Sequence, residues 1–296
     1  MNTIKRLMDI GEFQLISKIR RNISLGPSTI KGIGDDCAVL KYTKDKYLLF
    51  ATDMIIEGYH FRKNAKPESI GHKALAVNIS DIAACGGMPK WAVISAGLPP
   101  EIPYDYVRRI YSGIKNLARR FKVDIVGGDT NSSKKIVLSV SVLGEVKKKN
   151  LALRSGAKDK DIIFLSGPLR KKPDDLNFMP RVKEALYLVE NFKVNSMIDI
   201  SDGFFSDLDH ILKESRKGAI IYESLIPFKG ERRSLRDILN TGEQFELIFT
   251  LPRYCLNELP KGIYPVGEIA ENERGIIFIT RNGKREKPQS GGYRHF

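Results

Sequence analysis

The chain has 296 residues, 42% of them hydrophobic and 28% charged, which is typical of an ordinary soluble protein with a sizeable core. No stretch approaches the roughly 18 to 20 apolar residues of a membrane span, and charges interrupt the first ten residues, so we expect neither a transmembrane helix nor a signal peptide. Three widely spaced cysteines, Cys37, Cys85 and Cys255, indicate reduced thiols and a cytoplasmic protein.

The net charge is +14, from 49 basic and 35 acidic residues. Such an excess suits nucleic acid, an anionic surface or small anionic substrates. The basic residues come mostly as short doublets and triplets, and the sequence has neither an aromatic RNA-binding motif nor zinc-finger spacing. We therefore expect the charge to steer phosphate ligands, with no nucleic acid as a partner.

The first predicted element is an amphipathic helix near the N-terminus. Asp9 and Glu12 resemble a capping box, and apolar residues follow at helical spacing over residues 13–23. The glycines of residues 32–36, GIGDD, then allow a sharp turn before a short strand over 37–40. The sequence has no phosphate-loop motif and no complete dinucleotide fingerprint, so an ATP site must be of another kind.

The next stretch, residues 51–61, brings Asp53, Glu57 and His60 together within eight positions. It follows an apolar run over 47–50, which we interpret as the end of a strand. One Asp after a strand is ordinary turn chemistry, because Asp caps helices and tolerates tight turns. This stretch indicates a functional site only in combination with the other acidic segments of the chain.

A mostly apolar helix is expected over residues 70–84. Ala74, Val77, Asn78 and Asp81 share one stripe of it, since they lie three and four positions apart. A charge at Asp81 on or beside a packed face needs a partner. The partner is a lysine or backbone amides in one interpretation and a metal ion in the other.

The clearest amphipathic helix covers residues 104–121. A short strand over 123–126 is expected to stop at a turn over 127–130, GGDT, and residues 136–143 alternate as in a strand. The basic run over 147–149 marks a hinge between the two halves of the chain.

The second half again alternates strands and helices, which indicates an α/β or α+β chain. A strand over residues 197–200 leads into Ser201-Asp202-Gly203. The other predicted strands cover 162–165, 219–222, 246–251 and 275–280, the helices cover 182–189 and 204–212, and a turn covers 282–283.

Five acidic segments flanked by Gly or Ser are expected to converge. They are residues 32–36, 51–53, 78–81, 127–130 and 199–203. Converging carboxylates repel one another unless cations lie between them. Hard oxygen ligands favour Mg²⁺, and Mg²⁺ held by few carboxylates usually brings a polyphosphate with it.

Taken together, these segments resemble the thiamine-monophosphate kinase family, which shares a superfamily with aminoimidazole ribonucleotide synthetase and selenophosphate synthetase. The resemblance covers almost the whole chain, and the order and spacing of its motifs make it specific. The motifs are residues 11–13 (GEF), 32–36 (GIGDD), 52–53 (TD), 57–61 (EGYHF), 73–81 (KALAVNISD), 127–130 (GGDT), 154–157 (RSGA), 198–203 (IDISDG) and 242–243 (GE).

The resemblance implies a two-domain α/β (α+β) fold like that of aminoimidazole ribonucleotide synthetase. We expect an N-terminal domain, residues 1–147, that binds ATP and Mg²⁺ and forms a homodimer, and a C-terminal domain, residues 148–296. The resemblance also implies a kinase that phosphorylates thiamine monophosphate to thiamine diphosphate, with several Mg²⁺ ions and with ATP as co-substrate.

By the same resemblance, three sets of residues form the site. The Mg²⁺ ligands are Asp36, Thr52, Asp53, Asp81, Asp129, Asp199 and Asp202. The ATP contacts are Tyr111, Gly128, Asp129, Arg154 and Ser201, and the acceptor contacts are His60, Glu243 and Ser290.

The implied mechanism fits these residue types. Phosphoryl transfer needs positioning and charge neutralisation more than covalent help. The acceptor is a phosphate monoester whose second pKa is about 6, so it arrives largely ionised at neutral pH. We therefore expect direct in-line transfer, without a phosphoenzyme and without a residue acting as general base.

Two positions depart from the family pattern, and both are expected near the acceptor. Gln244 stands where the family commonly has Asp, and Ser290 stands where it often has an aromatic residue. One rival interpretation is a sister enzyme with another acceptor, although selenophosphate synthetase would carry a reactive cysteine before Cys37. The other rival is a non-catalytic nucleotide or nucleic-acid binder on the same scaffold.

Overall fold

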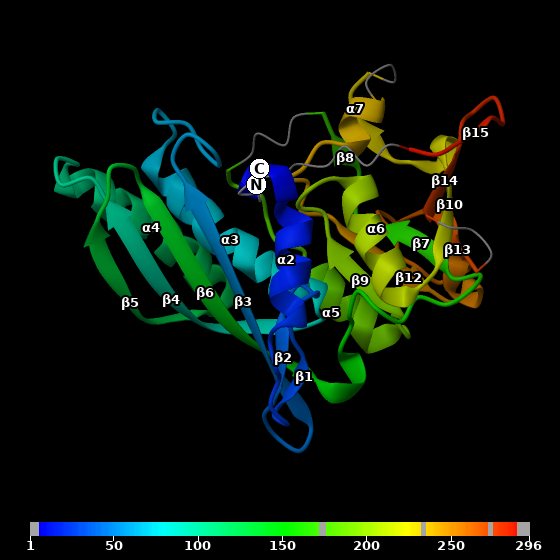
Figure 1. The fold of residues 1–296 in the computed structure, drawn as a ribbon, viewed down its shortest axis with the longest axis horizontal. Helices are drawn as coiled ribbons and strands as arrows, with labels where there is room; N and C mark the ends of the chain where they lie inside the picture. Colours follow the sequence, from blue (N-terminus) through cyan, green and yellow to red (C-terminus); the bar gives the residue numbers. More distant parts are fainter. Residues whose placement is uncertain (1–5, 172–175, 232–234, 272–274, 289–296) are drawn as a thin grey trace, which may run out of the picture.

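The computed structural model describes residues 6–171, 176–231, 235–271 and 275–288. These residues form two larger β-sheets that lie side by side, each accompanied by helices, and one small two-stranded sheet (Figure 1). This mixture of sheets and helices confirms the predicted α/β class.

The first sheet has six strands in the order β1-β2-β3-β6-β4-β5, and all neighbours are antiparallel except β4 and β5. Its strands are β1 (Thr29–Lys31), β2 (Ala38–Lys41), β3 (Lys46–Ile56), β4 (Met88–Leu98), β5 (Asp124–Ser132) and β6 (Val137–Lys147). Helix α3 (Pro67–Ala84) packs on β3, β4 and β6, and α4 (Tyr104–Phe121) packs against α3. Both helices occur where the sequence predicts them.

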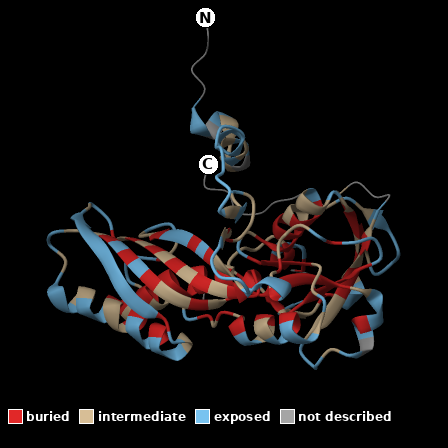
Figure 2. Cartoon of the chain, turned by 90° about the horizontal axis from the view of Figure 1, so that it is seen from below, coloured by how far each residue is buried: buried red, intermediate tan, exposed pale blue. Residues whose placement is uncertain are grey.

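Strand β6 shows that helices cover only one face of this sheet. Leu138, Val140, Val142, Gly144 and Val146 are buried, whereas the residues that alternate with them, 139, 141, 143 and 145, are only half-buried. Because successive side chains of a strand point to opposite faces, the buried set lies on the face that α3 covers. Figure 2 shows this alternation as stripes along the strands.

Two glycines let α3 and α4 approach closely. A Cβ atom at Gly71 would lie 1.9 Å from the carbonyl oxygen of Ile110, and a Cβ atom at Gly113 would lie 1.9 Å from that of Glu68. Each helix therefore presents a glycine to the backbone of the other, which lets α4 lie directly against α3.

The second sheet has seven strands in the order β15-β14-β10-β13-β7-β12-β9. Its strands are β7 (Ile162–Leu165), β9 (Ser196–Asp199), β10 (Gly218–Tyr222), β12 (Leu247–Leu251), β13 (Tyr264–Ala270), β14 (Gly275–Ile279) and β15 (Arg285–Glu286), and β8 (Leu169–Arg170) pairs with β11 (Phe228–Lys229). The other elements of this half are the helices α5 (Val182–Asn191), α6 (Phe204–Ser215) and α7 (Leu235–Leu239) and the 3₁₀ turns η1 (Lys148–Asn150), η2 (Glu223–Leu225) and η4 (Arg253–Asn257). The sequence analysis missed β13 and the two-residue strands.

The two sheets share a hydrophobic core. One cluster of buried side chains contains Leu49 and Ile82 from the first half and Phe164 and Phe249 from the second, whose rings stack with centroids 5.5 Å apart. A second cluster lies around α6. The shared cluster fixes the position of one sheet relative to the other, and the acidic segments meet along this junction.

The N-terminal helix differs from its prediction. It is divided into α1 (Leu7–Ile10) and α2 (Glu12–Arg21) at Gly11, whose φ of 73° lies in the left-handed region. Asp9 accepts a hydrogen bond from the Arg6 N–H at 2.8 Å within α1. The prediction that Asp9 starts the amphipathic helix was therefore wrong, and Gly11 precedes α2.

Two of the acidic segments lie inside strands. Asp53 is paired with Val140 in the middle of β3, and Gly128 is paired with Ile94 within β5. The predicted turns after residue 50 and over 127–130 were therefore wrong. At Gly128 a Cβ atom would lie 2.0 Å from the carbonyl oxygen of Ile94, so this glycine permits a close strand approach.

Two predictions about the whole chain can be compared with the described residues. No helix among them combines the length and the apolar composition needed to cross a lipid bilayer. Cys37, Cys85 and Cys255 are buried free thiols, in agreement with the predicted reduced state.

Candidate active site

Three carboxylates from three different elements meet at the junction of the two sheets. Asp36 precedes β2, Asp81 lies in the last turn of α3, and Asp199 ends β9. One carboxylate oxygen from each lies within 4.8 Å of the others. The sequence prediction of converging acidic segments holds for these three.

Burial and mutual repulsion make this cluster hold protons or cations. Burial, reinforced by the charge of Asp36, raises the pKa of Asp199 to about 7. Burial also raises the pKa of Asp81 well above its usual range, and the charges of Asp53 and Asp199 add to that effect. Ser80 donates a hydrogen bond to Asp199 at 2.5 Å, which holds one carboxylate in place.

Arg154 pairs with the third member of the cluster. Its Nη2 and Nε atoms donate to Asp36 Oδ1 at 2.6 and 3.2 Å. Asp36 Oδ2 is buried and has no hydrogen-bond partner among the described residues. A buried carboxylate oxygen left without a donor is costly, so a cation at this position would stabilise it.

Asp53 and Thr52 lie on β3, next to the three-carboxylate cluster. After burial, the charge of Asp53 is the next largest cause of the raised pKa of Asp81. Thr52 Oγ accepts a hydrogen bond from Ser141 at 2.9 Å and donates to the carbonyl oxygen of Val140 at 3.3 Å. Asp53 therefore acts electrostatically on the cluster without being one of its three carboxylates, while Thr52 is held by β6.

Asp129 lies away from the cluster. A row of paired residues runs across the sheet from Asp129 in β5 to Met54 in β3. It passes through Ser95 in β4 and Ser139 in β6. This row crosses three strand spacings of about 4.8 Å, so Asp129 lies roughly 14 Å from β3. The row also belongs to the exposed face of the sheet, whereas Asp53 is paired with the buried Val140.

The other two predicted ATP contacts of the first half also lie outside the cluster. Gly128 lies beside Asp129 in β5, all of which is exposed. Tyr111 is half-buried on α4, where it packs against the core. Within one chain the structure does not bring these residues to the three carboxylates.

A cavity of about 620 Å³ opens beside β3 and contains most of the remaining predicted residues. It connects the acidic residue Asp53 with residues predicted to bind the acceptor. Its lining includes Glu12, Asp53, Tyr59, His60, Arg62, Lys73, Lys171, Ser201, Asp202, Gly242, Glu243 and Phe245. The structure therefore places predicted metal, ATP and acceptor residues around one opening.

The loop that carries Glu243 is tightly held. Glu243 has a φ of 58°, in the left-handed region, and its N–H donates to the carbonyl oxygen of Ser201 at 2.7 Å. A Cβ atom at Gly242 would lie 2.6 Å from the same oxygen, so the loop passes close to the Ser201 backbone. The Glu243 carboxylate accepts a hydrogen bond from Lys73 Nζ at 2.5 Å.

Gln244, one of the two departures from the family pattern, points elsewhere. Its side-chain oxygen accepts from the Arg170 N–H at 2.9 Å, and its amide donates to the Arg170 carbonyl oxygen at 2.8 Å. Gln244 therefore anchors the loop to β8, and it is not among the residues that line the cavity beside β3. The other departure, Ser290, lies outside the described residues.

A second group of possible ligands surrounds Asp202. Ligand atoms of Asp202, Asp207 and His210 lie within 4.8 Å of one another. Asp207 accepts hydrogen bonds at 3.0 Å from the N–H groups of Asp202 and Gly203, so it fixes the start of α6. Burial, together with the Arg154 charge, lowers the pKa of His210 to about 4, which keeps its imidazole neutral.

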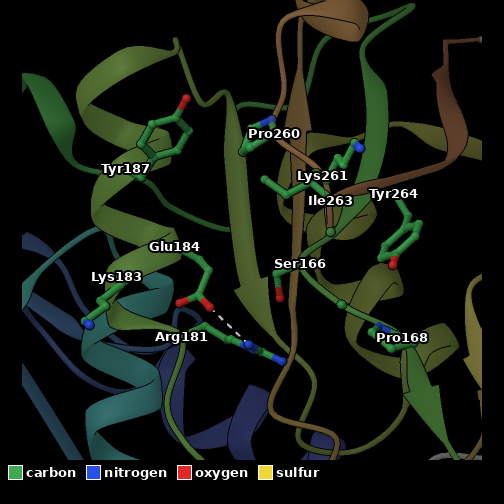
Figure 3. Close-up of a pocket in the computed structure, with 12 residues that line it drawn as sticks. Ser166, Pro168, Arg181, Lys183, Glu184, Tyr187, Pro260, Lys261, Ile263 and Tyr264 are labelled. Atoms are coloured by element: carbon green, nitrogen blue, oxygen red, sulfur yellow. Dashed lines mark hydrogen bonds and ion pairs between the residues drawn. The ribbon is translucent and has the colours of Figure 1, made fainter.

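A second cavity, of about 600 Å³, lies between α5 and the loop before β13 (Figure 3). Arg181 donates to Glu184 at 3.0 Å, the dashed line in Figure 3, and pairs with the buried Glu246. Glu246 also accepts a hydrogen bond from Ser166 at 2.7 Å. These groups bind one another around Glu246, which directly precedes β12.

The sequence analysis did not single out several residues that shape the site. Lys73 and Asp35 lie inside motifs that the sequence analysis had quoted, so their motifs could have pointed to them. Asp207 and His210 lie on α6, outside every quoted motif, and nothing in the sequence pointed to them. Burial, reinforced by the Asp36 charge, raises the pKa of Asp35 to about 7.

Comparison with known proteins identifies similar chains. Residues 34–146 match the family model "AIR synthase related protein, N-terminal domain". A thiamine-monophosphate kinase of Buchnera aphidicola from Schizaphis graminum is 33% identical over 98% of this chain and 100% of its own length. One of Aquifex aeolicus is 32% identical over the same shares.

Solved structures give the same result. A structure described as AaThiL complexed with AMPPCP and TMP covers 100% of both chains at 31% identity, with a TM-score of 0.87. A thiamine monophosphate kinase from Aquifex aeolicus covers 96% of this chain and 100% of its own, at 29% identity and a TM-score of 0.80. A chain in a structure described as a HypE–HypF complex, at 18% identity and a TM-score of 0.78, shares the fold.

Proposed function

The chain belongs to the thiamine-monophosphate kinase family, and we propose that it transfers the terminal phosphoryl group of ATP to the phosphate of thiamine monophosphate, giving thiamine diphosphate. The observation that carries this proposal is the three-carboxylate cluster of Asp36, Asp81 and Asp199 beside a cavity that holds His60 and Glu243.

The Mg²⁺ ions of this reaction are assigned to the cluster. Asp36, Asp81 and Asp199 would hold them, with Asp53, Thr52 and Asp202 alongside. The unsatisfied Asp36 Oδ2 and the raised pKa of Asp199 support this assignment, because both are relieved by a cation. Bound Mg²⁺ neutralises the phosphate charge that develops during transfer.

The ATP end includes residues from two copies of the chain. Arg154 and Ser201 lie beside the cluster in the same chain, whereas Gly128, Asp129 and Tyr111 would come from the partner in a homodimer. The position of Asp129 on the exposed face of the first sheet supports this assignment, because within one chain it lies roughly 14 Å from β3, and Gly128 lies beside it in β5.

An apolar sheet face supports the homodimer. Phe50, Met54 and Val93 lie on the face of the first sheet away from α3, and their exposed fractions are 43%, 50% and 41%. Large apolar side chains left exposed on one face of a sheet favour a partner that covers them. We assign residues 1–147 to the domain that dimerises and residues 148–296 to the second domain.

The acceptor end needs no general base. The phosphate of thiamine monophosphate is largely ionised at neutral pH and attacks in line. His60 and Glu243 line the cavity that would hold the thiamine part, and Ser290 remains assigned to this end from the sequence alone. The buried free thiols support a cytoplasmic location.

One assay tests the proposed function. Purified protein is incubated with ATP, Mg²⁺ and thiamine monophosphate, and thiamine diphosphate is detected by chromatography. We expect product only with all three, and a loss of about 10²-fold or more in kcat for Asp199→Asn. Undiminished turnover in excess chelator would contradict the metal assignment, and no product from the wild-type protein would contradict the acceptor.

A further inference from the structure

Among the residues that the structure describes, Lys73 is the largest fully buried side chain that carries a charge. It lies on α3, its side chain is 2% exposed, and it lines the acceptor cavity. A buried ammonium group is costly unless it is paired and hydrogen-bonded. The groups that pair with the Lys73 ammonium therefore indicate what this residue does in the site.

Both partners of Lys73 belong to the acceptor end of the site. Its Nζ donates to Glu243 Oε1 at 2.5 Å and to the carbonyl oxygen of His60 at 2.9 Å. His60 belongs to the loop after β3, and Glu243 belongs to the loop before β12, 170 positions away from Lys73 in sequence. One ammonium group thus joins the two halves of the chain at the residues predicted to bind the acceptor.

The pairing also changes what Glu243 offers to a ligand. A free carboxylate would attract the positive thiazolium ring through its net charge. Next to Lys73, the pair is neutral as a whole, and one carboxylate oxygen is already taken. With 41% of its side chain exposed, Glu243 still has an oxygen available as a hydrogen-bond acceptor.

From this geometry we infer that Lys73 is a positioning residue that fixes Glu243 and the His60 loop, so that the cavity recognises the acceptor by a hydrogen bond to its aminopyrimidine. This inference rests on the proposed function. The neutral pair selects for an amino group that donates, and it gives no particular preference for the cationic ring. The Glu243 N–H donates to the carbonyl oxygen of Ser201, and the next residue, Gln244, binds both backbone groups of Arg170, so the loop holds Glu243 in place.

The test uses two acceptors, thiamine monophosphate and oxythiamine monophosphate, which carries an oxo group in place of the pyrimidine amino group. We expect the wild-type protein to prefer thiamine monophosphate in kcat/KM by roughly 10- to 150-fold, the range of a hydrogen bond to a charged group. Lys73→Met should lose most of this preference and raise the KM for thiamine monophosphate, while the KM for ATP changes little.

A matched control is Lys66→Met at the exposed start of the same helix, which should leave the preference unchanged. In the double variant Lys73→Met/Glu243→Gln, the preference and the KM should be no worse than in Lys73→Met, because both residues act through one contact. Circular dichroism establishes which variants are folded. If Lys73→Met does not fold, the exposed Glu243→Gln carries the test, and it too must lose the preference.

The outcomes separate the two proposals. If the wild-type protein forms no thiamine diphosphate, the proposed function fails. If it does, and folded Lys73→Met keeps the wild-type preference, or loses activity equally for ATP and for the acceptor, the inference about Lys73 is overturned. Unchanged preference in Glu243→Gln overturns it as well.

Discussion

The Arg154 guanidinium donates two hydrogen bonds to one oxygen of Asp36, from Nη2 at 2.6 Å and from Nε at 3.2 Å. The Asp36 side chain is only 1% exposed, so this contact neutralises a buried charge. It leaves Oδ2 without a partner among the described residues. Arg154 therefore stabilises the carboxylate without occupying the position that a metal ion would take.

This relationship predicts a large loss of stability on removal of Arg154. In excess chelator, Arg154→Met should lower the free energy of unfolding by about 3 to 5 kcal/mol, because a buried charge is left unpaired. Mg²⁺ at about 100 times its dissociation constant should restore roughly 2.7 kcal/mol. Urea denaturation with and without Mg²⁺ measures both effects.

The matched control is Arg108→Met, because Arg108 forms an exposed pair with Asp105 at 2.6 Å. Exposed ion pairs contribute about 0 to 1 kcal/mol, so this variant should stay near wild type. If Arg154→Met and Arg108→Met lower the free energy of unfolding equally, Arg154 does not stabilise the protein by neutralising a buried charge.

The raised pKa of Asp199, about 7 in the folded protein, predicts a pH dependence of stability without metal. The unfolded carboxyl titrates near 3.9, so between about pH 4 and pH 7 the folded state holds a proton that the unfolded state has lost. Raising the pH through this window should therefore destabilise the metal-free protein, by up to about 4 kcal/mol for this group. Above about pH 7 its contribution is constant.

Urea denaturation at several pH values in chelator measures this slope. His210 opposes it, because its folded pKa of about 4 means that stability is lost as the pH falls from about 6.5. The contribution of Asp199 is therefore the difference between wild type and Asp199→Asn. If Asp199→Asn has the wild-type slope, the pKa assignment is wrong. Saturating Mg²⁺ should flatten the wild-type slope, since the cation replaces the protons.

The sequence predicted regular elements well where a period was visible. The helix over residues 104–121 has the bounds that its apolar stripe indicates, because one face packs against α3 and the other faces solvent. The acidic segments were harder. Asp53 and Asp129 are of a residue type that favours turns. Asp53 nevertheless lies inside β3, which pairs with β6, and Asp129 lies inside β5, which pairs with β4.

Long-range pairing explains what the sequence left open at the site. Lys73 and Glu243 are 170 positions apart, and no local pattern reports that one ammonium group joins them. Gln244 looked like an acceptor residue because of its place in a motif, but the left-handed backbone at Glu243 and Phe245 turns its side chain toward β8. Motif position predicted the region of the site, and backbone geometry decides which side chains enter it.

The close contact of α3 with α4 predicts that Gly71→Ala is destabilising. The added methyl group would lie 1.9 Å from the carbonyl oxygen of Ile110, so the two helices must separate. Overpacking of this kind costs about 1 to 3 kcal/mol. Gly26→Ala, where no atom lies within 4 Å of the added carbon, is the control and should be nearly neutral. Denaturation midpoints that do not differ between the two variants would contradict this packing argument.

The last prediction concerns the assignment of Asp129 to the partner's site. Asp53→Asn and Asp129→Asn should each lose about 10²-fold or more in kcat as homodimers. In a mixed dimer, one site would carry both substitutions and the other site would carry neither. After unfolding and refolding an equal mixture, about one quarter of the wild-type activity should therefore return, since half of the dimers are mixed and half of their sites are intact.

A second mixture is the control for this experiment. Asp53 and Asp81 act in the same chain, as the effect of the Asp53 charge on the pKa of Asp81 indicates, so mixing Asp53→Asn with Asp81→Asn leaves every site damaged. That mixture should recover no activity. It therefore shows that refolding by itself does not restore activity, so that recovery in the first mixture indicates a site shared between two chains. If the first mixture also stays inactive, Asp129 does not act across the dimer. Wild-type turnover by Asp129→Asn alone would remove it from the site. Recovery in the first mixture alone requires Asp129 to act from the other chain, because roughly 14 Å of sheet separates it from β3 in its own.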